Sequence, residues 1–468
     1  MSVLMLATPR MRGTADLVCP ARGSCVTRAR PTDASVRPAC EAHIQNHLCG
    51  DTVVPRRRFA RAQAAVRNNA STVDLAATAD TGARDRRGGN LSNWQPLDVA
   101  DDDLEELRIR LRVTRWPQPW PVPAWDAGTD LVELQELCAY WADEFDWRAA
   151  EAEINALPHH LADMADRVLH YLKFDSETGS GPAIVLTNGW PSSFFELVGL
   201  AQRLSAPSRF GLHGQTAFTV VVPSIPGFGF SPQRPTLPSD RLTHELWHDL
   251  MLSLGFSTYL AHGGDLGAGT TSRLAAAHPE AVRGVHLMAV GAPVDLDERT
   301  LSEEERDFLA RSADWNRVEG AYMHQHQTRP MTLSVGLSDS PAGMLSWILE
   351  KYRAWADLNG DLLTTFSREF LLKQASLYWF TNTIGTSLRP YYEYGRGVAR
   401  GLTYVQTPTA VALFPADLAR PPLSWAQRTH NVVQYSLMPR GGHFAPIEAP
   451  DELAADIRRF ERQLSLHS

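Results

Sequence analysis

One short segment, AHGGDLGAG around Asp265, restricts the fold of this chain more than any other. The apolar run 258–261 before it predicts a buried strand, and the run 270–277 after it predicts a helix. Gly263 and Gly267 flank the aspartate at two residues on either side, which suits a sharp strand-to-helix turn that pushes one side chain into a cleft. A carboxylate at such a turn can attack a saturated carbon and form an alkyl ester with the protein. The alternative is a chance match in an ordinary loop. The motifs elsewhere in the chain decide between a nucleophile and such a chance match.

Strand and helix patterns alternate along most of the chain after residue 160. The expected strands are residues 168–174, 183–187, 218–222, 259–261, 285–290, 409–414 and 432–438. Such alternation predicts an α/β fold with a mostly parallel sheet covered by helices. Between the fifth and sixth of these strands the chain is rich in helix-forming and aromatic residues, which predicts a helical lid inserted into the sheet domain.

A helical meander is expected before the sheet. Asp101 is a candidate cap for a first helix, and further helices are predicted around residues 131–145 and 146–157, with a last one at 450–464. The predicted division has five segments. They are an arginine-rich, disordered extension at 1–90, the helical N-terminal segment at 91–160, the sheet domain at 161–293, the lid at 294–401 and the rest of the sheet domain at 402–468.

Composition narrows the class of protein. Residues 1–90 hold fourteen arginines, seven acidic residues and no lysine, yet no motif or aromatic interleaving accompanies them, so no nucleic-acid partner is expected. The apolar opening is too short for a membrane span or a signal peptide. Four of the five cysteines lie irregularly in this extension and predict neither a disulfide framework nor a zinc site. We expect a soluble, cytoplasmic protein, and a homodimer is one assembly that the sequence allows.

Two further residues complete a nucleophilic constellation. His443 follows the last expected strand in the segment RGGHF, where a catalytic base is placed in such folds. Asp417 follows the preceding strand and is the candidate for the acid that orients this histidine, with Glu448 as a rival. The order Asp265, Asp417, His443 fits an α/β-hydrolase. Backbone amides of Trp190, in the loop after the second strand, and Leu266 are the expected oxyanion donors.

The chain resembles the epoxide hydrolases of the α/β-hydrolase fold, in the microsomal-like branch that begins with a helical segment. The resemblance covers residues 93–464. Its motifs are TRWP at 114–117, EFDWR at 144–148, GWP at 189–191, PGFGFS at 226–231, GGD at 263–265 and GGHF at 441–444. In this family two lid tyrosines hydrogen-bond the epoxide oxygen, and the matching positions are Tyr322 and Tyr391, with Tyr392 as the competitor of the second.

The resemblance implies an aspartyl ester mechanism. Asp265 would open the ring of a small apolar epoxide, the two phenols would donate to the ring oxygen, and His443 would activate the water that releases a vicinal diol. No metal or organic cofactor is expected. The alternatives are a haloalkane dehalogenase that uses the same aspartate, and a non-catalytic ligand-binding protein of this fold.

This sequence departs from the family pattern at three positions. Asn188 stands where histidine is usual, and Leu266 stands where tryptophan is usual, so the loop support and the pocket wall are expected to differ. Asp417 stands where the microsomal-like branch often has glutamate. None of the three removes a proposed donor or base, because the oxyanion donors are backbone amides.

Overall fold

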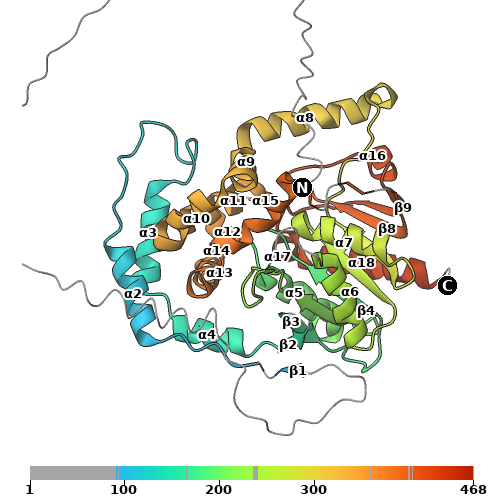
Figure 1. Ribbon diagram of the computed structural model, residues 1–468, viewed down its shortest axis with the longest axis horizontal. Coiled ribbons are helices and arrows are strands. Elements are labelled where there is room, and N and C mark those ends of the chain that lie inside the picture. The colour runs from blue at the N-terminus through green and yellow to red at the C-terminus, as the bar shows by residue number, and fades with distance from the viewer. Residues whose placement is uncertain are drawn as a thin grey trace, which may run out of the picture. The chain divides into compact units, whose positions relative to one another are not determined.

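A nine-stranded sheet forms the centre of the computed structural model (Figure 1). The structure describes residues 91–92, 94–164, 167–235, 241–358, 360–398, 401–402 and 404–466, so the prediction for residues 1–90 lies outside the described residues. The sheet order is β1-β2-β3-β5-β4-β6-β7-β8-β9, with β1 to β3 antiparallel and the strands from β5 to β9 parallel. The strands are β1 (Leu91–Ser92), β2 (His159–Asp163), β3 (Val168–Phe174), β4 (Ala183–Thr187), β5 (Thr219–Pro223), β6 (Tyr259–Gly263), β7 (Val282–Leu287), β8 (Val405–Leu413) and β9 (His430–Leu437). The predicted α/β-hydrolase fold is confirmed.

Helices cover both faces of the sheet because the side chains of each strand alternate between the faces. In β4, Ile184 and Leu186 pack in the apolar cluster that contains α5 (Phe194–Ser205) and α18 (Pro450–Ser465). Val185 packs in the other large cluster, which contains α6 (Thr243–Ser253) and α7 (Asp265–Ala277). All five residues of β4 are therefore buried, as the continuous apolar run predicts.

Physical reasons explain why the sequence pattern missed two strands and predicted a third too short. β2 has the sequence HHLAD, which offers little apolar alternation, and β1 is only two residues long. β8 begins at Val405, four residues before the expected start. The expected strand began just after Pro408, whereas the observed strand continues through this proline. A proline lacks the N–H for the ladder, and the register shifts between Val405 and Pro408.

Eight lid helices lie between β7 and β8 in the described part of the chain (Figure 1). They are α8 (Glu303–Glu319), α9 (Ala321–Thr328), α10 (Pro330–Asp339), α11 (Pro341–Trp355), α12 (Leu362–Thr365), α13 (Arg368–Thr381), α14 (Ile384–Ser387) and α15 (Arg389–Gly395). A Ser–Glu capping box starts α8, where Ser302 and Glu305 satisfy each other's backbone amides. Among the described helices, none combines the length and the apolar character needed to cross a bilayer.

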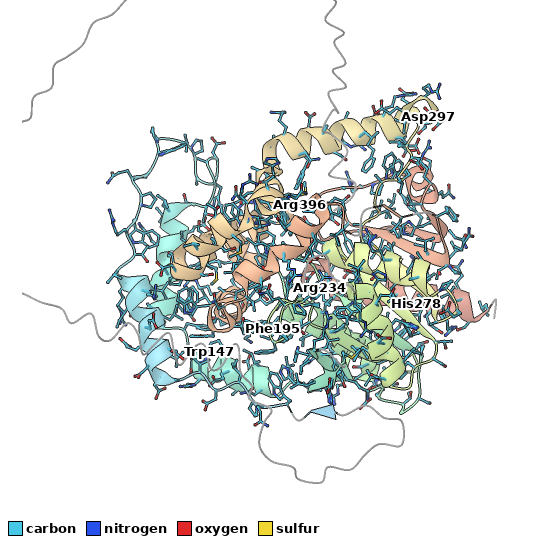
Figure 2. The ribbon with its side chains drawn as sticks, in the orientation of Figure 1. Trp147, Phe195, Arg234, His278, Asp297 and Arg396 are labelled. Carbon is cyan, nitrogen blue, oxygen red and sulfur yellow. The ribbon has the colours of Figure 1, made fainter. Side chains whose placement is uncertain are left out.

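The N-terminal segment forms α2 (Asp101–Arg112), α3 (Leu131–Asp143) and α4 (Trp147–Asn155). The prediction that Asp101 caps the first helix is wrong: the cap position is Ala100, and Asp101 is the first helical residue. An acid there still favours the helix, because the N-terminal turn carries unpaired N–H groups and a positive dipole. Trp147, labelled in Figure 2, packs its ring on Phe380 of the lid, with ring centroids 4.6 Å apart.

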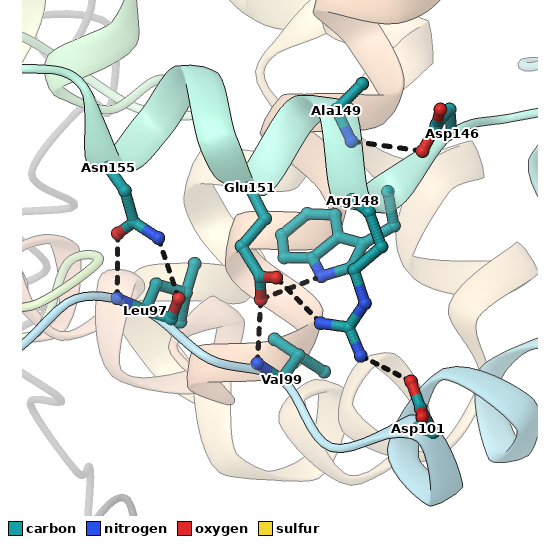
Figure 3. Close-up of polar contacts among 9 residues, drawn as sticks. Leu97, Val99, Asp101, Asp146, Arg148, Ala149, Glu151 and Asn155 are labelled. Atoms are coloured by element: carbon teal, nitrogen blue, oxygen red, sulfur yellow. Dashed lines mark hydrogen bonds and ion pairs between the residues drawn. The ribbon is translucent and has the colours of Figure 1, made fainter.

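Glu151 of α4 holds the strand-like segment before α2 against the rest of the N-terminal region (Figure 3). Its Oε1 accepts hydrogen bonds from the Val99 amide at 2.7 Å and the Trp147 indole at 3.2 Å, and its Oε2 accepts from Arg148 at 2.7 Å. Asn155, one turn further on, bonds both the amide and the carbonyl of Leu97 at 2.8 Å. The side chains of Glu151 and Asn155 thus supply the hydrogen bonds that a neighbouring strand would otherwise give to the backbone of residues 97–99.

Replacing Glu151 with alanine should lower the free energy of unfolding by about 2–3 kcal/mol, because two buried donors lose their acceptor. The matched control is Glu153→Ala in the same helix, whose side chain is 67% exposed and pairs with Lys373 on the surface. That control should cost less than about 1 kcal/mol. Urea unfolding of both variants measures the difference, and equal losses would contradict the role given to Glu151.

Candidate active site

Asp265 occupies the strained turn between β6 and α7. Its φ is 46°, in the left-handed region that side chains other than glycine rarely adopt, and the residue is buried. The turn fits only because its neighbours lack side chains. A Cβ on Gly189 would lie 2.4 Å from the Asp265 Cβ, and one on Gly267 would lie 2.1 Å from the Thr187 carbonyl oxygen. The loop after β4 and the turn after β6 therefore touch backbone to backbone.

This close approach brings one predicted oxyanion donor onto the carboxylate. The Trp190 amide donates a 3.0 Å hydrogen bond to Asp265 Oδ1. Leu266 is the second residue of α7, and backbone N–H groups in the first turn of a helix have no acceptor within the helix. Asn188, the departure in this loop, donates to the Gly189 carbonyl at 2.9 Å and so supports the loop itself.

His443 lies between the two aspartates that the sequence singled out. Its Nδ1 is 2.8 Å from Asp417 Oδ1, and its Nε2 is 3.9 Å from Asp265 Oδ2. Glu448, the rival of Asp417, instead accepts from the backbone amides of Phe444 at 2.8 Å and Asp357 at 2.6 Å. Glu448 therefore closes the loop that carries His443, and Asp417 is the carboxylate that contacts the imidazole.

The carboxylates around His443 favour its charged form. Burial alone lowers the pKa of this imidazole, but the charges of Asp417, Asp265 and Glu196 oppose burial and raise the pKa to about 9. The imidazole of the resting protein is thus protonated at neutral pH. Any event that removes the charge of Asp265 removes one of these contributions and lowers the pKa of His443.

The two predicted tyrosines both pack against the indole ring of Trp190. Tyr322 of α9 stacks on the Trp190 ring at 5.6 Å, and Tyr391 of α15 meets that ring edge-on at 6.0 Å. Burial, followed by the negative charge of Asp265, raises the pKa of both phenols well above 10, so both stay protonated. The buried Tyr391 hydroxyl faces Tyr322 but has no well-aligned hydrogen bond among the described residues. Tyr392 points elsewhere and lies against the guanidinium of Arg396.

A small polar cavity of about 10 Å³ lies beside Asp265 and His443. That volume suits about one water molecule. Asn188 Oδ1 and His262 Nε2, on residues lining this cavity, are buried and lack a hydrogen-bond partner among the described residues. Buried polar atoms of this kind are normally satisfied by ordered water.

Sequence analysis missed two residues of this region. Glu196, in the first turn of α5, lines the small cavity, and burial raises the pKa of its carboxyl to about 7. Its only sequence signal is an acid inside the apolar run FFELVGL. Lys351 of α11 is buried, and its ammonium lies 4.7 Å from the centre of the Tyr322 ring. One lysine in an aromatic lid helix was visible in the sequence, but its aromatic partner on another helix was not.

A potential metal-ligating group lies away from this site. His248, His278 and Glu280 have ligand atoms close together, and His278 follows α7 at the end opposite Asp265 (Figure 2). The two imidazole rings stack face to face, with centroids 3.6 Å apart and planes 4° from parallel. In-plane lone pairs of parallel rings do not converge on one ion, so this arrangement is stacking rather than a tetrahedral site.

The fold and the aspartate at its turn define a hydrolase of the α/β-hydrolase class, and comparisons with known proteins agree. Residues 94–197 match the family described as Epoxide hydrolase N terminus, and residues 182–327 match the alpha/beta hydrolase fold. A putative epoxide hydrolase of Stigmatella aurantiaca is 38% identical over 371 residues, covering 78% of this chain and 84% of that protein. Epoxide hydrolase 1 of Oryctolagus cuniculus is 32% identical over 396 residues, covering 78% and 87%.

A solved structure gives the same result. The epoxide hydrolase of Aspergillus niger is 30% identical and superposes with a TM-score of 0.69, covering 81% of this chain and 97% of that one. The chain belongs to the epoxide hydrolase family and is an enzyme of that family. The resemblance seen in the sequence motifs is confirmed.

The position of His443 between two carboxylates predicts how its pKa responds to charge removal. Asp265→Asn should lower the pKa of this imidazole from about 9, and Asp417→Asn should lower it further because the Asp417 charge acts more strongly. NMR titration of ¹⁵N-histidine protein measures both, with His443→Gln identifying the signal. An unchanged pKa in both variants would contradict this arrangement.

The same raised pKa fixes the sign of a stability effect. An unfolded histidine has a pKa near ~6.5, so the protonated form of His443 stabilises the fold fully below that pH. This contribution is lost as the pH rises through about 9. As the pH rises between these values, the free energy of unfolding of the wild type should therefore fall relative to that of His443→Gln.

Proposed function

We propose that this enzyme hydrolyses an epoxide to a vicinal diol through an ester on Asp265. The observation that carries the proposal is the arrangement of its two carboxylate oxygens. Oδ1 accepts from the Trp190 amide, and Oδ2 is the oxygen nearest to His443 Nε2, at 3.9 Å. One oxygen thus accepts from a backbone amide, and the other faces the imidazole.

In the first step Asp265 Oδ2 attacks a ring carbon of the epoxide. The carbon–oxygen bond of the ring breaks, and the ring oxygen takes a proton from Tyr391 or Tyr322. A phenol suits this role because it is protonated at neutral pH and its anion is a tolerable product. The Tyr391 hydroxyl has no well-aligned hydrogen bond among the described residues, which supports its assignment as a donor to the ring oxygen. The product is a hydroxyalkyl ester on Asp265 and a tyrosinate.

In the second step water splits the ester. Formation of the ester removes the charge of Asp265, which lowers the pKa of His443, so the Nε2 proton passes to the tyrosinate and Nε2 can accept another. A water in the small cavity gives that proton to His443 and attacks the carboxyl carbon of Asp265. The amides of Trp190 and Leu266 hold the oxyanion. The bond between the carboxyl carbon and the ester oxygen then breaks, the leaving alkoxide takes the second proton of the water to become the diol, and the oxygen of the water stays in the carboxylate.

The proton balance closes within the site. His443, oriented by Asp417, keeps the proton that it took from the water and is again protonated, the tyrosine has already regained its proton, and Asp265 regains its negative charge. The overall reaction consumes one epoxide and one water. None of these steps uses a metal ion or an organic cofactor.

Two alternative functions have less support. A haloalkane dehalogenase needs side-chain donors for a halide beside the nucleophile, and Leu266 offers none. A non-catalytic binding protein has no need for a base that is bonded to an orienting acid and placed near the same carboxylate. The two phenols near Asp265 favour a leaving alkoxide over a halide.

A His443→Gln variant should accumulate the ester, because alkylation needs Asp265 and the tyrosines whereas hydrolysis needs the base. Intact mass spectrometry after incubation with a panel of aromatic and aliphatic epoxides should record an adduct of one epoxide mass. The double variant with Asp265→Asn is the control and should stay unmodified. A folded His443→Gln protein with no adduct, together with no diol from the wild type, would sink the mechanism.

Replacing Tyr391 with phenylalanine should lower kcat/KM for epoxides by roughly 10–100-fold, because one of two donors to the ring oxygen is lost. Tyr392→Phe is the matched control, since that neighbouring phenol lies against Arg396 instead. Steady-state rates of diol formation measure both variants. Equal losses for the two would contradict the assignment of Tyr391.

A further inference from the structure

A larger cavity of about 130 Å³ also has Asp265 in its lining and follows α7. Asp265 and Leu266 line its beginning, and Arg273, two turns further along the same helix, lines it as well. The lid helix α15, which carries Tyr391, contributes Pro390 and Glu393 to the opposite wall. This cavity therefore leads from the nucleophile toward a polar region that the proposed mechanism does not use.

Arg273 is a partly buried cation that pairs with no carboxylate of the described residues. Burial lowers the pKa of its guanidinium, and the neighbour that opposes this effect is the phenol of Tyr394. Among the described residues no carboxylate forms an ion pair with Arg273. A buried charge without a counter-charge is costly, so a site of this kind is prepared for an anion.

The second arginine of the cavity adds to this positive charge. Arg234, labelled in Figure 2, pairs with the buried carboxylate of Glu393. Arg389 binds the same carboxylate through Glu393 Oε1 at 2.8 Å. One carboxylate thus serves two guanidinium groups.

The remaining titratable groups of the lining do not cancel that charge. Burial lowers the pKa of His244, which pairs with Glu245, and burial lowers the pKa of His430 to about 4, so His430 is neutral at pH 7. His430 bonds Ser272 at 3.0 Å. Among the described lining residues the negative charges are Glu393, already shared, and Asp265 at the start of the cavity.

We propose that the preferred substrates are compact epoxides that carry a carboxylate, which Arg273 binds while the ring lies at Asp265. This inference rests on the proposed epoxide hydrolysis and names its substrate class. Helical side chains lean toward the N-terminus of the helix, so the Arg273 guanidinium leans toward Asp265. The ring and the carboxylate are then separated by on the order of 5–10 Å, between one and two turns of α7.

Charge also fixes the direction of binding. A substrate carboxylate placed at the Asp265 end would face a like charge, whereas at the other end it meets a guanidinium that can bind both of its oxygens. The volume of about 130 Å³ is close to that of a cavity that holds benzene, at roughly 150 Å³. The substrate is therefore a short epoxy acid rather than a long-chain one.

The test compares a terminal epoxide of a five- or six-carbon acid with its methyl ester. The wild type should hydrolyse the acid with a kcat/KM at least about 10-fold above that of the ester, as one charged hydrogen-bonded contact predicts. Arg273→Gln should raise KM for the acid by about 10-fold or more and leave kcat and the ester's kcat/KM within about 2-fold. Arg273→Lys keeps the charge and should recover part of the preference for the acid.

Arg317→Gln is the control for loss of a positive charge, because that lid side chain is 73% exposed. It should leave the ratio of acid to ester unchanged. Equal rates for acid and ester in the wild type, with no change of the ratio in Arg273→Gln, would overturn the carboxylate proposal while epoxide hydrolysis stands. No diol from either compound, and no ester adduct in His443→Gln, would instead overturn the proposed function itself.

Discussion

The contact between the loop after β4 and the turn after β6 is the constraint on which the rest of the site depends. These strands are parallel neighbours, with Thr187 opposite Gly263, so the two segments leave the sheet at the same edge. Gly189 and Gly267 let the backbones approach until the Trp190 amide reaches Asp265. The positive φ of Asp265 is a strained conformation of the kind that persists only where the surrounding structure holds it. The position of this backbone donor therefore follows from the order of the strands in the sheet and from the two glycines, which lack side chains.

The charges of the site follow from this geometry. A buried carboxylate beside a buried imidazole stabilises the imidazolium, which makes His443 a poor base as long as Asp265 is free. The proposed ester neutralises Asp265 and lowers that pKa when a base is needed. The charge of the Asp265 carboxylate thus sets the order of the two steps, and no conformational change is needed to set it. Asp417 keeps the imidazole oriented through Nδ1.

Features fixed by local patterns could be predicted from the sequence, and features fixed by contacts between distant segments could not. The limits of β3 and β4 and the strand–turn–helix at Asp265 follow from apolar runs and glycines that are neighbours in the chain. His443 and Asp417 were found because a residue after a strand of a parallel sheet lies at a known edge. Glu196, Lys351 and Arg273 each occupy a helix position that looks ordinary until another segment packs against it.

The two cavities that meet at Asp265 separate the two reactants of the proposed cycle. His443 lines the small polar cavity and not the larger one, so the site for a water lies on the side of the base. Leu266, Arg234 and Arg273 line the larger cavity, whose volume is about 130 Å³. Because Asp265 lines both cavities, a water in the small one need not share the substrate's volume to reach the ester. The same separation lets the wall of the larger cavity vary in charge, as at Arg273, without disturbing the base.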